Sequence, residues 1–174
     1  MLTEDSASGE GFLASVTREW EDSATPAGQS GIRTANLRIG IVLSKSGGAL
    51  KQMLLPFRLG LGGRMGSGKQ WWSWIHIADL VSAVSHILQH QLSGPVDMVA
   101  PNPVTNAEFT AALARALHRP ALLPVPAWAL RLALREFADD GPLASARVIP
   151  KKLSENGFRF ALPDLPSALQ NFLV

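Results

Sequence analysis

The stretch that decides the fold is residues 59–80, LGLGGRMGSGKQWWSWIHIADL. It opens with a loop of five glycines, whose backbone can take positive φ angles and approach a ligand or another segment closely. Residues 71–77 are rich in aromatic and β-branched side chains, which is typical of a strand. Asp79 stands where it would cap a helix over residues 80–88. Loop, strand and capped helix in this order predict one wall of a ligand pocket.

The segments around this stretch alternate between strand and helix patterns. Residues 34–43, TANLRIGIVL, form an apolar run without a polar face, as expected of a strand covered on both sides in a parallel sheet. Residues 1–11 are polar and are expected to be flexible, and apolar positions at three- and four-residue steps predict an amphipathic helix over residues 12–24. The remaining expected helices span residues 49–61, 106–117, 127–137 and 163–173, and the remaining short strands span residues 96–99 and 158–160. We therefore predict an α/β fold, with Thr105 and Glu108 as a capping box.

Composition excludes several classes of protein. The 174 residues suffice for one domain, and 47% hydrophobic with 17% charged residues is a globular profile. A net charge of +2 without a basic run argues against a nucleic-acid groove, and the lack of cysteine excludes disulfides and thiolate zinc sites. No apolar run reaches about 18 residues, so no membrane span is expected, and the acidic start lacks the pattern of a secretion signal. We predict a cytoplasmic protein.

Two motifs imitate known sites. Residues 63–69 have the spacing of a phosphate-binding P-loop, but Gln70 stands where Ser or Thr should hold Mg²⁺, and the loop precedes a strand instead of a helix. The chain also contains no Gly-x-Gly-x-x-Gly dinucleotide turn. His86 and His90 are spaced for metal binding on a helix, yet no third ligand accompanies them, which favours a solvated helix face. No metal site is predicted.

His76 has two interpretations. On a strand it faces away from Ile75 and Ile77, so it could line a pocket as a proton donor or acceptor. It could instead be a structural histidine, hydrogen-bonded to Asp79 or to the backbone.

Motifs spread over nearly the whole chain carry a family resemblance. They are LRIGIVL (37–43), GSGKQWWSWIHIADL (66–80), APNPVTNAEF (100–109) and GFRF (157–160). In this order they are similar to the second half of extended short-chain dehydrogenase/reductases, in the epimerase-like branch that ends in a domain of unknown function. Members are labelled NAD-dependent epimerase/dehydratase, and some carry a cell-division-inhibitor label.

The resemblance implies the C-terminal part of a Rossmann-like NAD(P)-binding fold and a smaller, mostly helical domain. Residues 1–92 would be the Rossmann-like remnant with the substrate wall, and residues 93–174 the substrate-side domain. The glycine-rich dinucleotide turn of the family would lie upstream of residue 1. NAD or NADP is the implied cofactor.

Residue roles follow from the same resemblance. Ile39 and Val42 match positions that approach the nicotinamide ring, and Gln70, Trp72 and His76 match the substrate wall. The family acid/base pair is Tyr-x-x-x-Lys, but this chain has no tyrosine, so no catalytic residue is assigned. In nucleotide-sugar members, an arginine binds the diphosphate at the position where this chain has Trp72. The indole of tryptophan cannot neutralise a diphosphate as an arginine does. We therefore expect a less charged ligand than a nucleotide sugar.

Two functions stay open at this point. The first is the C-terminal half of an NAD(P)-dependent epimerase/dehydratase-like oxidoreductase that acts on a small molecule. The alternative is a non-catalytic binding or protein-interaction module without the cofactor cradle. In that case an exposed sheet edge would dock on a second copy, forming a homo-oligomer, or on the missing N-terminal half.

Overall fold

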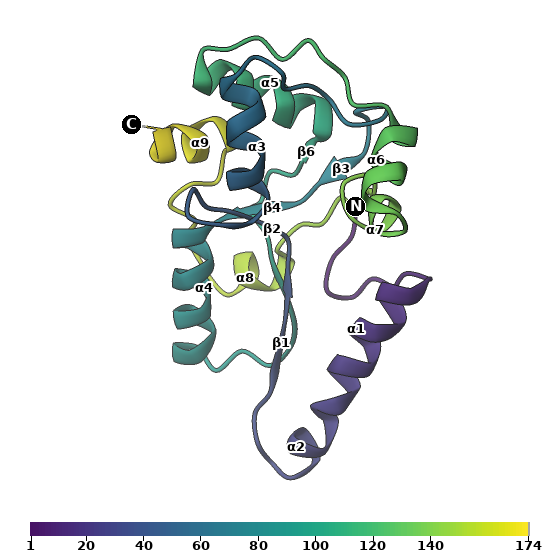
Figure 1. Ribbon diagram of the computed structural model, residues 1–174. Coiled ribbons are helices and arrows are strands. Elements are labelled where there is room, and N and C mark those ends of the chain that lie inside the picture. Colours follow the sequence, from purple (N-terminus) through teal and green to yellow (C-terminus); the bar gives the residue numbers. More distant parts are fainter. Residues whose placement is uncertain (174) are drawn as a thin grey trace.

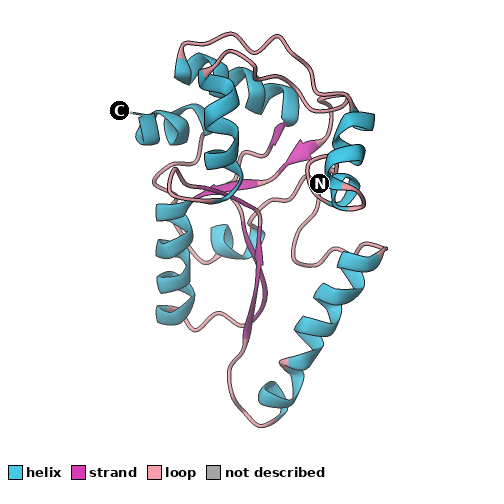
Figure 2. Ribbon diagram, in the orientation of Figure 1, coloured by secondary structure: helices cyan, strands magenta, loops and turns pink. Residues whose placement is uncertain are grey.

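The computed structural model describes residues 1–173 as an α/β arrangement, which confirms the predicted class. Figure 2 shows short strands at the centre of the molecule with helices around them. The helices are α1 (Phe12–Ser23), α2 (Thr25–Gln29), α3 (Gly48–Arg58), α4 (Ile77–Gln89), α5 (Asn106–Leu117), α6 (Ala127–Leu134), α7 (Phe137–Asp140), α8 (Lys151–Glu155) and α9 (Leu165–Leu173). The strands are β1 (Ala35–Ile39), β2 (Ile41–Leu43), β3 (Trp71–Trp72), β4 (Trp74–His76), β5 (Gly94–Met98) and β6 (Val104–Thr105).

Gly40 divides the strand that was expected to run unbroken over residues 34–43. Before it, β1 pairs in parallel with β5, and after it β2 pairs in parallel with β4. The Gly40 N–H donates to the Met98 carbonyl, and the next N–H, of Ile41, donates to the Ser73 carbonyl. A Cβ at Gly40 would lie 2.6 Å from the Ser73 carbonyl oxygen, so only glycine allows this change of partner.

The second expected strand, residues 71–77, is divided as well. Its first part, β3, pairs antiparallel with β6, and its second part, β4, pairs with β2. Each of the two runs therefore pairs with two different partner strands, one before and one after its division.

Two hydrophobic cores hold these elements together. The larger one joins α3, β2, β4, α5 and α9 around the buried side chains of Leu43, Trp74 and Phe109. The smaller one joins α4, β5 and α8 around Val96 and Leu153. Figure 1 shows α3, α5 and α9 grouped at one end of the molecule and α4 and α8 beside β1.

One face of β1 is not covered. Coverage on both sides was expected for residues 37–43, and Leu43 is fully buried, but Leu37 and Ile39 are 38% and 52% exposed. Within residues 1–173, β1 pairs with β5 alone, and α1 across from it buries none of its own residues. Figure 1 shows α1 standing apart from the helices of the two cores.

Two local expectations need correction. Asp79 is not the cap of α4, because the N-cap is His76 and the Asp79 carboxylate instead accepts the N–H groups of Ala161 and Leu162. Residues 158–160 form no strand, since the Phe158 N–H donates to the carbonyl of Leu153 in α8, a helix that was not expected.

Two expected helices also differ in extent. The helix expected over residues 127–137 ends at Leu134 because Arg135 has a φ of 54°, and α7 follows it. The last helix begins at Leu165 instead of residue 163.

The capping box of α5 is confirmed, with mutual hydrogen bonds between Thr105 and Glu108. Across residues 1–173, no helix combines the length and the apolar character that crossing a bilayer requires. The division into residues 1–92 and 93–174 stays a prediction.

Candidate functional site

A groove of about 1440 Å³ lies between α1, β1, α3 and the segment from α7 to residue 148. Ile39 and Ile41 line it from the strands, Met53 and Phe57 from α3, and Trp71 and Trp72 from β3. The uncovered face of β1 is therefore one wall of a cavity. We call this cavity the central groove; the residues that characterise it are Ile39, Ile41, Met53, Phe57, Trp71, Trp72 and Asp97.

The predicted substrate residues Gln70 and Trp72 are close together. Both are more than 90% buried, and both donate a side-chain N–H to the same acceptor, the Pro142 carbonyl oxygen, at 3.1 and 3.3 Å. The Gln70 amide also donates to the Met65 carbonyl at 2.9 Å, and the Trp72 ring packs edge-on against Phe109. Trp72 thus presents an apolar surface to the groove, while its N–H fixes the segment around Pro142.

His76 lies elsewhere and does not line the central groove. It is 3% exposed, its Nδ1 accepts the N–H of Ala78 at 3.0 Å, and its ring stacks on Phe172 with centroids 4.3 Å apart. Burial lowers the pKa of His76 below its usual value, and the nearby Asp79 carboxylate opposes this. The backbone hydrogen bond that the structural interpretation expected is present, and the role of His76 on the substrate wall stays a prediction.

The two residues predicted to face the cofactor are separated. Ile39 is half exposed and lines the groove, whereas Val42 lies beyond Gly40 and is not part of the lining. Their roles toward a nicotinamide ring remain predictions.

A network of charged residues beside the groove was not expected. Residues 1–11 were expected to be flexible, yet Glu4 is 7% exposed and accepts the backbone N–H groups of Asp97 and Lys152. Arg38, opposite Asp97 in the sheet, binds Glu21 of α1 through two hydrogen bonds of 2.7 and 2.8 Å. The network therefore ties the N-terminal segment and α1 to the two strands.

Asp97 has the most perturbed environment in this network. Its side chain is 4% exposed, and one carboxylate oxygen has no hydrogen-bond partner among the described residues. Burial raises the pKa of Asp97 to about 6, with Glu4 reinforcing the effect and Arg38 opposing it. A carboxyl group at the groove can thus hold or release a proton near neutral pH. No sequence motif marks it, because its partners are distant in the chain.

The glycine loop has a structural role. A Cβ at Gly63 would lie 1.9 Å from the Leu123 carbonyl oxygen, so the glycine lets residues 123–125 pass directly against the loop. The Val125 N–H donates to the Arg64 carbonyl, and the first N–H of α5, on Asn106, donates to the Gln70 carbonyl. Through these contacts the glycine loop holds α5 and residues 123–125 in place. This is a structural role and not the phosphate-binding role of a P-loop.

Two family models match this chain. Residues 25–100 match the NAD dependent epimerase/dehydratase family, and residues 125–172 match a domain of unknown function, DUF1731. Both matches agree with the resemblance found in the sequence motifs.

Curated relatives extend this likeness. Epimerase family protein Mb2239 of Mycobacterium bovis is 48% identical over 92% of this chain and 54% of its own length. Mouse epimerase family protein SDR39U1 is 41% identical over 98% of this chain and 59% of its own length. The chain therefore spans little more than half the length of these relatives.

Solved structures share the fold. The human epimerase family protein SDR39U1 (isoform2), crystallised with NADPH, superposes with a TM-score of 0.93 at 38% identity, covering 99% of this chain and 59% of that one. A UDP-glucose 4-epimerase from Thermus thermophilus, in complex with NAD, has a TM-score of 0.68 at 18% identity, covering 92% of this chain and 52% of that one, which shows the fold alone. The fold is thus Rossmann-like, as predicted.

Proposed function

We propose that this chain, which belongs to the NAD-dependent epimerase/dehydratase family, forms the substrate-facing part of an NAD(P)-dependent oxidoreductase and takes a weakly charged, mainly apolar small molecule in the central groove. The relatives contain a further segment of comparable length, and the cofactor cradle would be supplied by such a segment. The cytoplasmic location stays a prediction.

The proposed substrate class rests on the charged residues that line the central groove. Among the described lining residues the cations are Arg18 and Arg38, against the acids Glu21, Asp97 and Asp140. Arg38 is paired with Glu21, and Arg18 donates to the Gly9 carbonyl and the Ser8 hydroxyl. A diphosphate needs unengaged cationic donors, so this groove favours a neutral or weakly charged ligand.

The cofactor fits this chain on one side only. Ile39 offers a half-exposed apolar wall at the end of β1, suited to a nicotinamide ring. The printed sequence has no Gly-x-Gly-x-x-Gly turn to cradle a pyrophosphate. When bound, NAD(P) supplies hydride-transfer chemistry; this chain contributes the apolar wall and a proton-holding carboxyl group, Asp97.

A second candidate function is a non-catalytic interaction module. It is favoured by exposed apolar side chains around the uncovered strand, where Phe12 and Trp20 of α1 are 75% and 71% exposed. Such surfaces on a soluble domain mark contact with a partner or with a second copy.

Calorimetric titration tests the substrate class. We expect 4-phenyl-2-butanone, a neutral apolar ketone, to bind, and UDP-glucose not to bind. Ile39→Ala should weaken ketone binding severalfold without unfolding the protein, since Ile39 is half exposed. Trp72→Ala should weaken it more than His86→Ala, a change on α4 outside the groove. Tight binding of UDP-glucose, or equal effects of the last two changes, would overturn the proposal.

NADPH discriminates between the two candidate functions. A ligand present at 100 times its dissociation constant stabilises the folded state by about 2.7 kcal/mol. A rise in melting temperature with NADPH supports the oxidoreductase assignment. Ketone binding without any NADPH effect would leave this chain as the substrate-binding half alone. The absence of both effects would favour the interaction module.

A further inference from the structure

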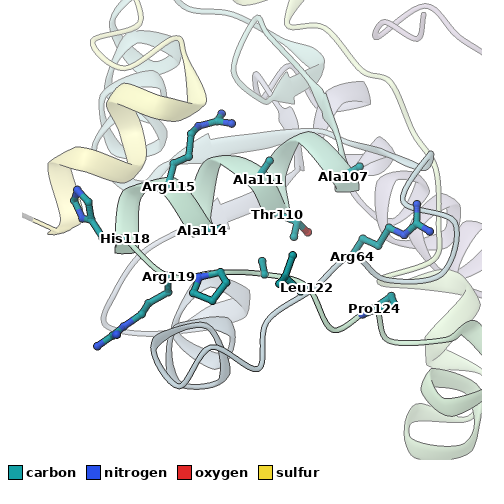
Figure 3. Close-up of a pocket in the computed structure, with 12 residues that line it drawn as sticks. Arg64, Ala107, Thr110, Ala111, Ala114, Arg115, His118, Arg119, Leu122 and Pro124 are labelled. Carbon is teal, nitrogen blue, oxygen red and sulfur yellow. The ribbon is translucent and has the colours of Figure 1, made fainter.

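A second cavity of about 860 Å³ lies between α5 and the segment that follows it, residues 118–124. It shares no lining residue with the central groove. Figure 3 shows α5 along one side of it and the extended segment along the other. We call it the arginine-rimmed cavity; the residues that define it are Arg64, Thr110, Ala111, Arg115, Arg119 and Leu122.

The body of the cavity is small and apolar. Ala107, Ala111 and Ala114 line it at successive turns of α5, and Leu122, which is 80% exposed, faces them from the opposite segment. Among the described lining residues the only aromatic ring is the imidazole of His118 at the rim, and no Phe, Tyr or Trp side chain lines the cavity. An aliphatic group therefore matches this surface.

Cations stand at both ends of this apolar surface. Figure 3 shows Arg64 at one end and Arg115, His118 and Arg119 at the other. The exposed side chains of Arg115 and Arg119 point away from the space between α5 and Leu122 and would have to turn toward a bound ligand. No carboxylate lines the cavity, and within residues 1–173 none of the three arginines forms an ion pair.

The helix dipole accounts for only part of this arrangement. A cation in the last turn of a helix is favourable, which explains Arg115. Arg64 comes from the glycine loop, however, and is held at the cavity by the hydrogen bond from Val125 to its carbonyl.

Thr110 is an independent indication of a ligand. Its side chain is 5% exposed and lines the cavity, and its hydroxyl has no hydrogen-bond partner among the described residues. Figure 3 shows it on the side of α5 that faces Leu122. A buried hydroxyl without a partner is unfavourable, and an anionic oxygen in the cavity would accept a hydrogen bond from it.

We propose that the arginine-rimmed cavity binds a small amphiphilic anion, with an aliphatic body against the alanines of α5 and a phosphate or carboxylate group held by the rim arginines and Thr110. Aliphatic contact supplies affinity, and the cationic rim selects the sign of the charge. The site is separate from the groove proposed for the substrate.

Calorimetry on the full chain with octyl phosphate, octanoate, octyltrimethylammonium and inorganic phosphate tests this. Both octyl anions should bind, and the tighter one identifies the head group. The cation should not bind, and inorganic phosphate should bind at least tenfold more weakly than octyl phosphate. Equal binding of the cation, or of inorganic phosphate, would overturn the proposal.

Variants locate the site. Arg64→Gln should weaken octyl phosphate about tenfold, the effect of losing one charged hydrogen bond. Thr110→Val should weaken it severalfold without lowering the melting temperature, because the hydroxyl it removes has no partner. Lys69→Gln is the matched control, since this exposed cation of the same loop does not line the cavity. An equal effect of Lys69→Gln, or weakening by Ile39→Ala in the central groove, would contradict the assignment; neither result bears on ketone binding.

Discussion

Gln70 and Trp72 share one hydrogen-bond acceptor, the carbonyl oxygen of Pro142. Trp72 lines the central groove and Gln70 does not, and together they hold a segment about 70 residues further along the chain. Because either donor alone can satisfy the carbonyl, the two side chains should act together on stability.

This sharing predicts a non-additive double mutant. Trp72→Phe and Gln70→Met should each lower the free energy of unfolding by about 1 kcal/mol, the net value of a hydrogen bond. The double variant should lose at least about 0.5 kcal/mol more than the sum, since it leaves the Pro142 carbonyl without a donor. Urea unfolding of the four proteins measures this, and strict additivity would refute the shared acceptor.

Gly40 should not tolerate a side chain. Its Cβ would meet the Ser73 carbonyl at 2.6 Å and the Val99 side chain at 2.7 Å, so Gly40→Ala should lower the free energy of unfolding by about 1–3 kcal/mol. Gly9→Ala is the control, because the nearest atom to its Cβ would be 3.9 Å away. Thermal unfolding of both variants should separate them clearly.

Asp97 should make stability depend on pH. Its pKa is about 6 in the folded state against 3.8 as the ordinary value, so the unfolded chain releases this proton first as pH rises. The contribution of Asp97 is therefore fully present below about pH 4, declines up to about pH 6 and is constant above it. The decline should amount to about 1–3 kcal/mol.

Asp97→Asn is the measurement that isolates this effect. Unfolding free energies of both proteins, taken from pH 4 to 7, should diverge, with the natural protein losing stability relative to the variant as pH rises. Glu4, Glu21, Arg38 and Lys152 surround Asp97 and remain in both proteins. A constant difference across this range would show that Asp97 ionises normally.

Glu21 should control the mobility of α1. The helix buries none of its residues, and Arg38 holds it through Glu21. Glu21→Gln should speed amide hydrogen exchange in α1 by about two- to fivefold, since a partly exposed ion pair contributes up to about 1 kcal/mol. Glu19→Gln, an exposed change on the same helix, should have no such effect, and high salt should reduce the difference.

Local signals made much of this fold predictable. The Thr105–Glu108 capping box depends on residues three apart, and α5 begins where that motif places it. Gln70 directly precedes β3 and Trp72 lies in it, so the family motif that grouped them involves residues only two positions apart.

Long-range contacts account for what the sequence could not reveal. Gly40 divides a strand because of Ser73, and Glu4 is buried because of the Asp97 N–H, 93 residues away. The arginine-rimmed cavity likewise combines Arg64 with α5, and no local pattern links them.

Asp79 bears on how this protein can be cut or recombined. Asp79, 2% exposed in the first turn of α4, accepts hydrogen bonds on both carboxylate oxygens from two backbone N–H groups of the C-terminal region, those of Ala161 and Leu162. If residues 125–172 were exchanged for a foreign sequence, the buried Asp79 carboxylate would lose both hydrogen-bond donors unless the new sequence supplied two N–H groups at the same places. The two regions that match separate family models are thus joined through a buried side chain of one and the backbone of the other.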